Sequence, residues 1–149
     1  MDTKIITLYF SLFLIFLSIQ INTIYAQKIK FEHISSEKGL SQGSVTCVAQ
    51  DKKGFMWFGT YDGINRYDGY NFKIFRNEPN NPNSISNNFV RTMLVDNSGT
   101  LWAGTQGGGV NRYDNENNNF IRYQNDPENE NSLSHDNIFK ILQDSFGSI

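Results

Sequence analysis

A repeated segment of 45 to 48 residues constrains the fold of this chain more than any other feature of its sequence. The stretch QDKKGFMWFGT around Trp57 returns as VDNSGTLWAGT around Trp102, and the connecting segment NEPNNPNSIS returns as NDPENENSLS. Self-similarity at such a period is typical of repeat architectures. We therefore divide the sequence into two complete repeats and the start of a third, at about 41–85, 86–133 and 134–149.

Each repeat predicts four short strands separated by turns with aspartate and glycine. Aromatic residues, which favour strands, make up 14% of the chain. The strands are expected at Val45–Gln50, Phe55–Thr60, Ile64–Tyr67 and Phe72–Phe75, and again at Phe89–Val95, Thr100–Thr105, Val110–Tyr113 and Phe120–Tyr123. Four strands in one repeat, with tryptophan and glycines at fixed offsets, match one blade of a β-propeller. The predicted fold class is all-β, a partial β-propeller of four-stranded blades.

The first 26 residues have the layout of a secretory signal peptide. An almost unbroken apolar run occupies 5–19, polar residues follow, and the small residue Ala26 ends the segment. The run is short for a membrane span, which needs roughly 20 residues. We expect cleavage after Ala26, with an uncleaved N-terminal anchor as the alternative. The predicted domains are a signal peptide at 1–26 and an incomplete propeller at 27–149, outside the cytoplasm.

The glycine cluster Gly107-Gly108-Gly109 raises the question of a phosphate-binding loop. Such a loop leads into the N-terminus of a helix, whose free N–H groups bind the anion. Here the glycines lie between two predicted strands, and the first repeat has only the tripeptide DGI at the corresponding place. The cluster is therefore interpreted as a turn.

No group of residues in the sequence has the spacing of a catalytic or metal site. His33 and His135 stand apart from each other and from further ligands. Cys47, the one cysteine, lies in an apolar run and is interpreted as a small buried hydrophobe. The net charge of −2 provides no basic surface for nucleic acid. We expect no catalytic, cofactor-binding or metal-binding residue, and the sequence assigns no ligand-binding residue.

Three aspartates and two tryptophans recur with the repeat. Asp51, Asp96 and Asp144 each precede a turn glycine, where their carboxylates are expected to accept hydrogen bonds from backbone N–H groups. Trp57 and Trp102 lie in the most apolar strand of each repeat, which favours packing between blades. The alternative is that their rings stack on sugars at a propeller mouth. The asparagine-rich connectors are interpreted as solvated loops, with hydrogen bonding to a polar ligand as the alternative.

The segments FEHISSEKGLSQGSV, MWFGTYDGINRYDG and LWAGTQGGGVNRYD together resemble the two-component regulator propeller repeats of Bacteroidetes hybrid sensor histidine kinases. The resemblance covers residues 31–149. In that family a periplasmic sensor, usually two propellers and a small β-sandwich, precedes a membrane span, a kinase and a receiver. The resemblance implies an inner-membrane parent protein that senses oligosaccharides and commonly signals as a homodimer. It also implies that residues 29–34 form a strand that closes the last blade of the first propeller.

The residues and the resemblance together predict a ligand-sensing periplasmic segment of a hybrid two-component sensor kinase. Its expected partners are an oligosaccharide, the missing blades of the same propeller and a second copy of the chain. The motifs of a kinase or receiver do not occur in the sequence, so this fragment is expected to have no catalytic activity of its own. The alternatives are a free-standing exported propeller that binds glycan or protein, a propeller polysaccharide lyase truncated here, and a truncated product without function.

Overall fold

The computed structural model describes residue 13 and residues 29–149. The chain divides into two compact units, Met1–Glu32 and His33–Ile149, and the strands of the described residues all lie in the second. The predicted signal peptide lies outside the described residues, except for Phe13. None of the helices that the structure describes is long and apolar enough to cross a bilayer.

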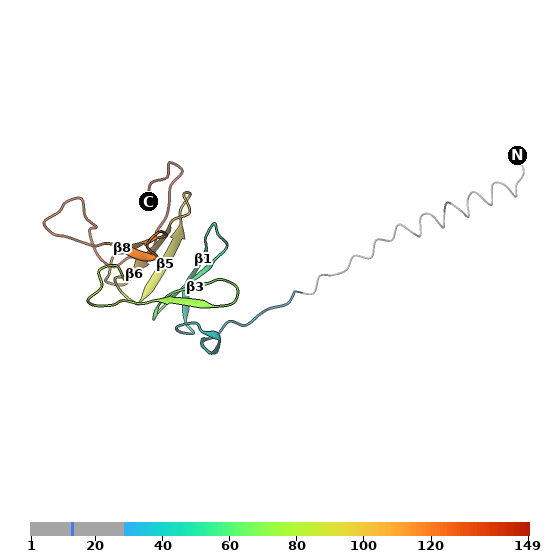
Figure 1. Ribbon diagram of the computed structural model, residues 1–149. Coiled ribbons are helices and arrows are strands. Elements are labelled where there is room, and N and C mark those ends of the chain that lie inside the picture. The colour runs from blue at the N-terminus through green and yellow to red at the C-terminus, as the bar shows by residue number, and fades with distance from the viewer. Residues whose placement is uncertain (1–12, 14–28) are drawn as a thin grey trace, which may run out of the picture. The chain divides into compact units, whose positions relative to one another are not determined.

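The second unit is built from two four-stranded antiparallel sheets, each with its strands in chain order (Figure 1). A turn of 3-10 helix, η1 (Ser36–Lys38), precedes the first sheet. The strands of the first sheet are β1 (Val45–Gln50), β2 (Met56–Thr60), β3 (Gly63–Tyr67) and β4 (Phe72–Phe75). Those of the second are β5 (Val90–Val95), β6 (Leu101–Thr105), β7 (Val110–Asp114) and β8 (Asn119–Tyr123). The predicted all-β fold of four-stranded repeats is confirmed, with every strand end within one residue of its expected position.

The first two strands of each sheet are joined by a turn whose glycine adopts a left-handed conformation. The φ angles of Gly54 and Gly99 are 89° and 95°, a region that other residues rarely adopt. The N–H of Gly54 donates to the carbonyl of Asp51 at 3.0 Å, and that of Gly99 donates to Asp96 at 2.9 Å. The repeated aspartate and glycine therefore reverse the chain and bring the two strands into register.

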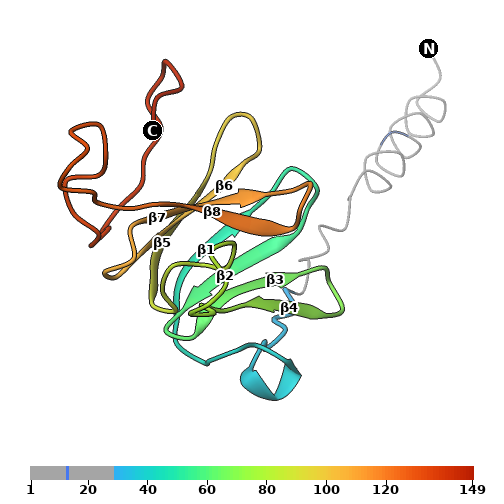
Figure 2. The ribbon, with the colours of Figure 1, turned by 60° about the vertical axis from the view of Figure 1, so that its left-hand side comes forward.

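The two sheets pack face to face (Figure 2). Aromatic rings fill the space between them. Trp57 of β2 is 1% exposed, and its ring centroid lies 4.8 Å from that of Tyr113 of β7. Phe75 of β4 lies 5.7 Å from Tyr113 and 5.3 Å from Phe120 of β8. Large buried rings supply much of the hydrophobic stabilisation of a small core. The interpretation of Trp57 as a packing residue between blades is confirmed.

A glycine in the second strand of each sheet makes room for an aliphatic side chain of the next repeat. Val90 opens β5, and its Cγ1 lies 2.8 Å from the position that a Cβ on Gly59 would occupy. Ile138 of the third repeat stands in the same relation to Gly104. A side chain at either glycine would displace its neighbour, so the glycine that follows each tryptophan reflects close packing between repeats.

The third repeat continues this packing without forming a strand. Residues 138–143 pair with no strand of the described residues. The N–H of Ile138 donates to the carbonyl of Thr105 at 3.0 Å, and the Gln143 side chain accepts the N–H of Asn97 at 2.8 Å. The segment therefore lies against the second sheet as β5 lies against the first.

The expectation that residues 29–34 form a strand is wrong. These residues are irregular. A strand requires a neighbour with which to exchange backbone hydrogen bonds, and no strand among the described residues pairs with this segment. The first repeat is less covered than the second at its first strand. Val45 is 40% exposed, whereas its counterpart Val90 is fully buried.

Candidate functional site

The loops of the two blades lie at opposite ends of the sheets. The turns between β1 and β2, between β3 and β4, and their counterparts in the second blade form one end. The segments that link one repeat to the next, 76–89 and 124–137, and the turns that follow β2 and β6 form the other. We call this second end the connector end.

At the end opposite the connectors, an aspartate binds both the turn and the tryptophan of its own repeat. Asp51 Oδ1 accepts the N–H of Lys53 at 2.9 Å and of Phe55 at 3.0 Å. Its Oδ2 accepts the indole N–H of Trp57 at 2.8 Å. The predicted capping role is confirmed, and the bond to the indole adds a function that the sequence analysis did not assign. The recurrence of tryptophan six residues after the aspartate was the available signal.

The second repeat makes the same interactions. The indole N–H of Trp102 donates to Asp96 Oδ2 at 2.8 Å, and the N–H of Thr100 donates to Oδ1 at 2.9 Å. Burial raises the pKa of Asp96, but hydrogen bonds from Ser98, Trp102 and Thr100 outweigh it and lower the pKa to about 2. In the third repeat Asp144 accepts the N–H groups of its turn as predicted. These aspartates are structural groups that hold the turn of each repeat.

A buried asparagine and two hydroxyl groups form a network at the connector end of each blade. Asn65 Oδ1 accepts the N–H of Ser41 at 2.8 Å, and its Nδ2 donates to Ser41 Oγ at 2.7 Å. Ser41 Oγ lies 3.0 Å from Thr60 Oγ1. The second blade repeats the network with Ser86, Thr105 and Asn111. Because these buried polar groups satisfy one another, they position the chain before each first strand and are not available to a ligand.

The glycine cluster is a turn, as predicted. Gly107 and Gly109 have φ angles of 75° and 74°, and β7 follows directly at Val110. The N–H of Gly109 donates to the carbonyl of Asp136 in the next connector at 2.8 Å. The turn therefore uses its backbone donor to hold the connector.

The connectors are ordered by hydrogen bonds of their own. The guanidinium of Arg122 donates to the carbonyls of Ser84 and Asn81 at 2.8 and 2.9 Å. His135 is exposed, and its Nδ1 accepts the N–H of Asn137 at 2.9 Å. Asn87 accepts the N–H two residues ahead in the same way. His135 thus acts as a loop residue, like its counterpart Asn87 in the preceding repeat.

Two aromatic rings flank one arginine at the connector end, and a third ring packs on one of them. The Cζ of Arg91 lies 5.1 Å from the ring centroid of Phe89 and 4.7 Å from that of Phe139. Tyr61 packs edge to face on Phe89 at 4.4 Å. Tyr61 and Phe139 are 52% and 71% exposed, so these two rings are open to solvent. These four residues and Gln106 form what we call the Arg91 cluster.

Backbone geometry and Gln106 position the arginine. The pairing of β5 with β6 shifts between Val90 and Thr92, which makes Arg91 the extra residue of a β-bulge. A bulge redirects the side chain that it carries. Arg91 Nε and Nη2 donate to Gln106 Oε1 at 3.2 and 2.6 Å. The side chain is thereby held between the rings of the cluster.

The charge of Arg91 is not neutralised by a neighbour. Arg76, also at this end, forms an ion pair with Asp62 at 2.8 Å, and its hydrogen bonds lower the pKa of that carboxyl. Within the part of the chain that the structure describes, no carboxylate forms an ion pair with Arg91. The cluster therefore combines an ordered cation with exposed aromatic rings.

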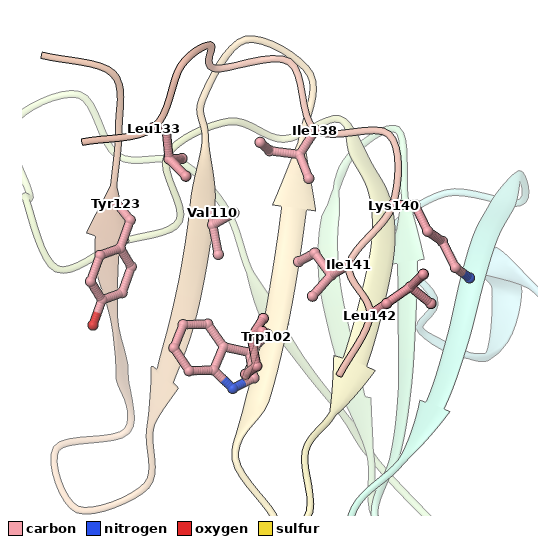
Figure 3. Close-up of a pocket in the computed structure, with 9 residues that line it drawn as sticks. Trp102, Val110, Tyr123, Leu133, Ile138, Lys140, Ile141 and Leu142 are labelled. Atoms are coloured by element: carbon pink, nitrogen blue, oxygen red, sulfur yellow. The ribbon is translucent and has the colours of Figure 1, made fainter. Parts of the chain in front are cut away.

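An apolar pocket of about 370 Å³ lies on the face of the second sheet that points away from the first (Figure 3). Trp102 and Tyr123 line it with rings 5.8 Å apart, as Trp57 and Phe75 stand 5.9 Å apart in the first blade. In the first blade the second sheet covers these rings, whereas Trp102 is only half-buried beneath Ile141 and its neighbours. We therefore interpret the pocket as a packing face for a further blade.

Classical reactive groups do not come together in the described residues. No group of three histidine, cysteine, aspartate or glutamate side chains among them has the arrangement of a metal site. His33 is exposed. Cys47, interpreted as a small buried hydrophobe, packs against the core and is half-buried, and burial raises the pKa of its thiol. A raised thiol pKa disfavours the reactive thiolate.

The sequence analysis missed the Arg91 cluster, although a comparison of the repeats contains a signal for it. The framework residues are the same in each repeat, whereas the cluster positions differ. Arg91 corresponds to Thr46 and Phe139, and Phe89 corresponds to Ser44. Positions at which one repeat departs from the others are not required by the fold and are free to serve a ligand.

Four-stranded meanders that stack through shared aromatic rings define a partial β-propeller. Two segments of the chain, residues 39–62 and 84–107, match the family model of the two component regulator propeller. Each segment contains the first two strands of a blade and the tryptophan of its repeat. The chain thus carries two-component regulator propeller repeats, and the resemblance inferred from the sequence is confirmed.

Solved structures and a curated relative agree with this result. The chain is similar to the extracellular domain of a hybrid two component system from B. thetaiotaomicron, with a TM-score of 0.72, 31% identity, and coverage of 78% of this chain and 16% of that chain. A second such domain from the same organism matches with a TM-score of 0.51 and 27% identity over 64% of this chain and 14% of that chain. Fifty-six residues are 50% identical to histidine kinase P4 of Formosa agariphila, covering 38% of this chain and 4% of the relative. The chain therefore spans a small part of each of these proteins.

Proposed function

We propose that the chain is part of the periplasmic ligand-sensing propeller of a hybrid two-component sensor kinase, and that the Arg91 cluster contributes to an oligosaccharide-binding site. The repeats and the similar extracellular domains support the sensor class. The signal-peptide pattern at residues 1–26 supports export. In this proposal the parent protein is held in the inner membrane and its kinase lies outside this chain.

The observation that supports ligand binding is the exposed group of rings around Arg91. Aromatic rings offer flat apolar faces on which the C–H faces of a sugar ring can stack. The guanidinium and Gln106 add polar groups that can orient sugar oxygens. The rings of Phe89 and Tyr61 contact each other, so part of the surface is ordered before a ligand arrives.

The proposed role is binding without chemistry in this segment. The recurring aspartates bind turn N–H groups and indoles, and the buried asparagines bind serine and threonine. Their polar atoms are occupied by the framework. Signal output then depends on the kinase of the parent protein, on the remaining blades of the propeller and on association with a second copy.

The test is glycan binding by the exported region of the full protein, which contains residues 29–149. Phe139→Ala removes an exposed ring of the cluster and is expected to weaken oligosaccharide binding by about tenfold, or about 1.4 kcal/mol. Isothermal titration calorimetry with a glycan selected on an array measures the change. Tyr70→Ala and Phe146→Ala remove exposed rings at the opposite end and serve as matched controls with unchanged affinity. The proposal fails when no glycan binds, or when Phe139→Ala binds as well as the controls.

A further inference from the structure

We infer that the oligosaccharide is acidic and that Arg91 binds its anionic group, either the carboxylate of a uronic acid or a sulfate ester. This inference rests on the proposed function of the same cluster and adds the chemical class of the ligand. It follows from the geometry and the charge of Arg91.

The guanidinium presents a free edge to solvent. Its Nε and Nη2 donate to Gln106 on one side. Nη1 has no hydrogen-bond partner among the described residues. Nη1 and the second hydrogen of Nη2 therefore form a pair of parallel donors, the arrangement that binds a carboxylate or a sulfate through two oxygens.

The two flanking rings fix the plane of this edge. Phe89 and Phe139 lie within cation–π distance of the guanidinium. A long side chain that is ordered before binding loses less conformational entropy when the ligand binds. The same exposed rings can stack on the sugar while the guanidinium binds its acidic substituent.

The fold does not require an arginine at this position. The corresponding residue of the first repeat is Thr46, whose hydroxyl donates to the carbonyls of Val90 and Gly59 at 2.6 and 3.0 Å. The guanidinium of Arg91 makes no such bond to the framework, and among the described residues its hydrogen bonds are with Gln106 alone. Its charge therefore serves a purpose other than packing.

The surrounding charges make the attraction local. The chain has a net charge of −2, so its surface as a whole does not attract anions. Arg76 at the same end is already paired with Asp62. Arg91 is the cation of the cluster itself, and the short range of screened attraction confines its effect to the cluster.

The test is a glycan array that carries neutral, uronate-containing and sulfated glycans, probed with the exported region of the full protein. Wild-type protein is expected to bind acidic glycans and not their neutral counterparts. Arg91→Gln is expected to lose this binding by tenfold or more, and Arg91→Lys to retain a part of it because the charge remains without the planar pair of donors. Arg76→Gln is the matched control, with unchanged binding. Thermal unfolding of each variant shows whether the fold is preserved.

The outcomes separate the two proposals. Binding to uronates alone or to sulfated glycans alone identifies which anion Arg91 binds. Binding of neutral glycans that is lost in Phe139→Ala and retained in Arg91→Gln overturns the acidic class and leaves the proposed function in place. Acidic binding that survives in Arg91→Gln also overturns the inference. A protein that binds no glycan contradicts the proposed function, and the inference falls with it.

Discussion

The sheet faces around Trp57 and Trp102 are built from equivalent positions of the two repeats and differ in what covers them. Both indoles donate to an aspartate at 2.8 Å, and both stand beside an aromatic ring of the fourth strand. Trp57 is sealed by Tyr113 of the next sheet. Trp102 faces a pocket of about 370 Å³ beneath the third repeat.

The difference shows that a blade of this type is complete only when the next one covers it. The sequence of a single repeat specifies its strands, its turn and its tryptophan. The burial of that tryptophan is specified by the following repeat. Stability in such proteins is accordingly shared between the repeats and the interfaces between them.

The tryptophans provide the largest test of this comparison. Trp57→Ala is expected to lower the free energy of unfolding by about 3–5 kcal/mol, because it opens a cavity in a sealed interface. Trp102→Ala is expected to cost about half as much in the present chain, because its ring is only half-buried. Denaturant unfolding monitored by circular dichroism measures both. Equal losses in the present chain would contradict the comparison, while a preparation with a further covering blade should make them equal.

The buried asparagines provide a matched test in which no difference is expected. Asn65→Ala and Asn111→Ala each leave Ser41 or Ser86 without its amide partner, at a cost of about 1–3 kcal/mol. Both networks lie within their own repeats, so the losses should agree. The same unfolding experiment applies, and a markedly smaller loss for Asn111→Ala would show that the second blade is not formed like the first.

Arg66 and Arg112, the equivalent arginines of the two Asn-Arg-Tyr-Asp motifs, extend the comparison to a smaller change in stability. Arg66 Nη1 donates to the hydroxyl of Tyr113 in the next blade at 2.9 Å. Arg112 Nε is buried without a hydrogen-bond partner among the described residues. Arg66→Met is expected to cost about 1 kcal/mol and Arg112→Met less than that or nothing. Unfolding midpoints in urea distinguish the two variants. A larger loss of stability for Arg112→Met than for Arg66→Met would contradict the comparison, because it would mean that the Arg112 guanidinium already has a stabilising partner.

The smallest expected effect is a pH dependence from Asp96. Its pKa of about 2 lies below the ordinary value of about 3.9. A carboxylate with a lowered folded-state pKa stabilises the fold above its unfolded pKa, and this contribution is lost as the pH falls from about 4 toward 2. Asp96→Asn is expected to flatten the stability profile in that range. Urea unfolding at pH 5 and at pH 2.5 measures the slope, and an unchanged slope in the variant would contradict the assignment.

Much of the fold was predictable because an alignment of the repeats with one another shows which residues recur. A glycine and an aspartate that return together mark a turn wherever they occur, so the strand bounds followed. The strand expected at 29–34 did not form because pairing depends on a neighbour and not on local sequence. The partial exposure of Trp102 could not be predicted either. Trp57 and Trp102 lie in matching sequence contexts, and the local sequence does not show which residues cover each ring.

The Arg91 cluster was less predictable for the opposite reason. Framework residues can be recognised because they recur in each repeat. Arg91 and Phe139 stand at equivalent positions of the second and third repeats, but the residue type differs. Their proximity arises from a bulge in β5 and from the seating of the third repeat on the second sheet. Neither feature is encoded in a spacing along the chain.

The most direct test of the account is a crystal structure of the exported region of the full protein with a glycan selected on the array. The account predicts a sugar ring against Phe139 or Tyr61 at the connector end, with an anionic oxygen within hydrogen-bond distance of Arg91, and a further blade over Trp102. A glycan seated in the apolar pocket at Trp102, with the Arg91 cluster empty, would contradict it.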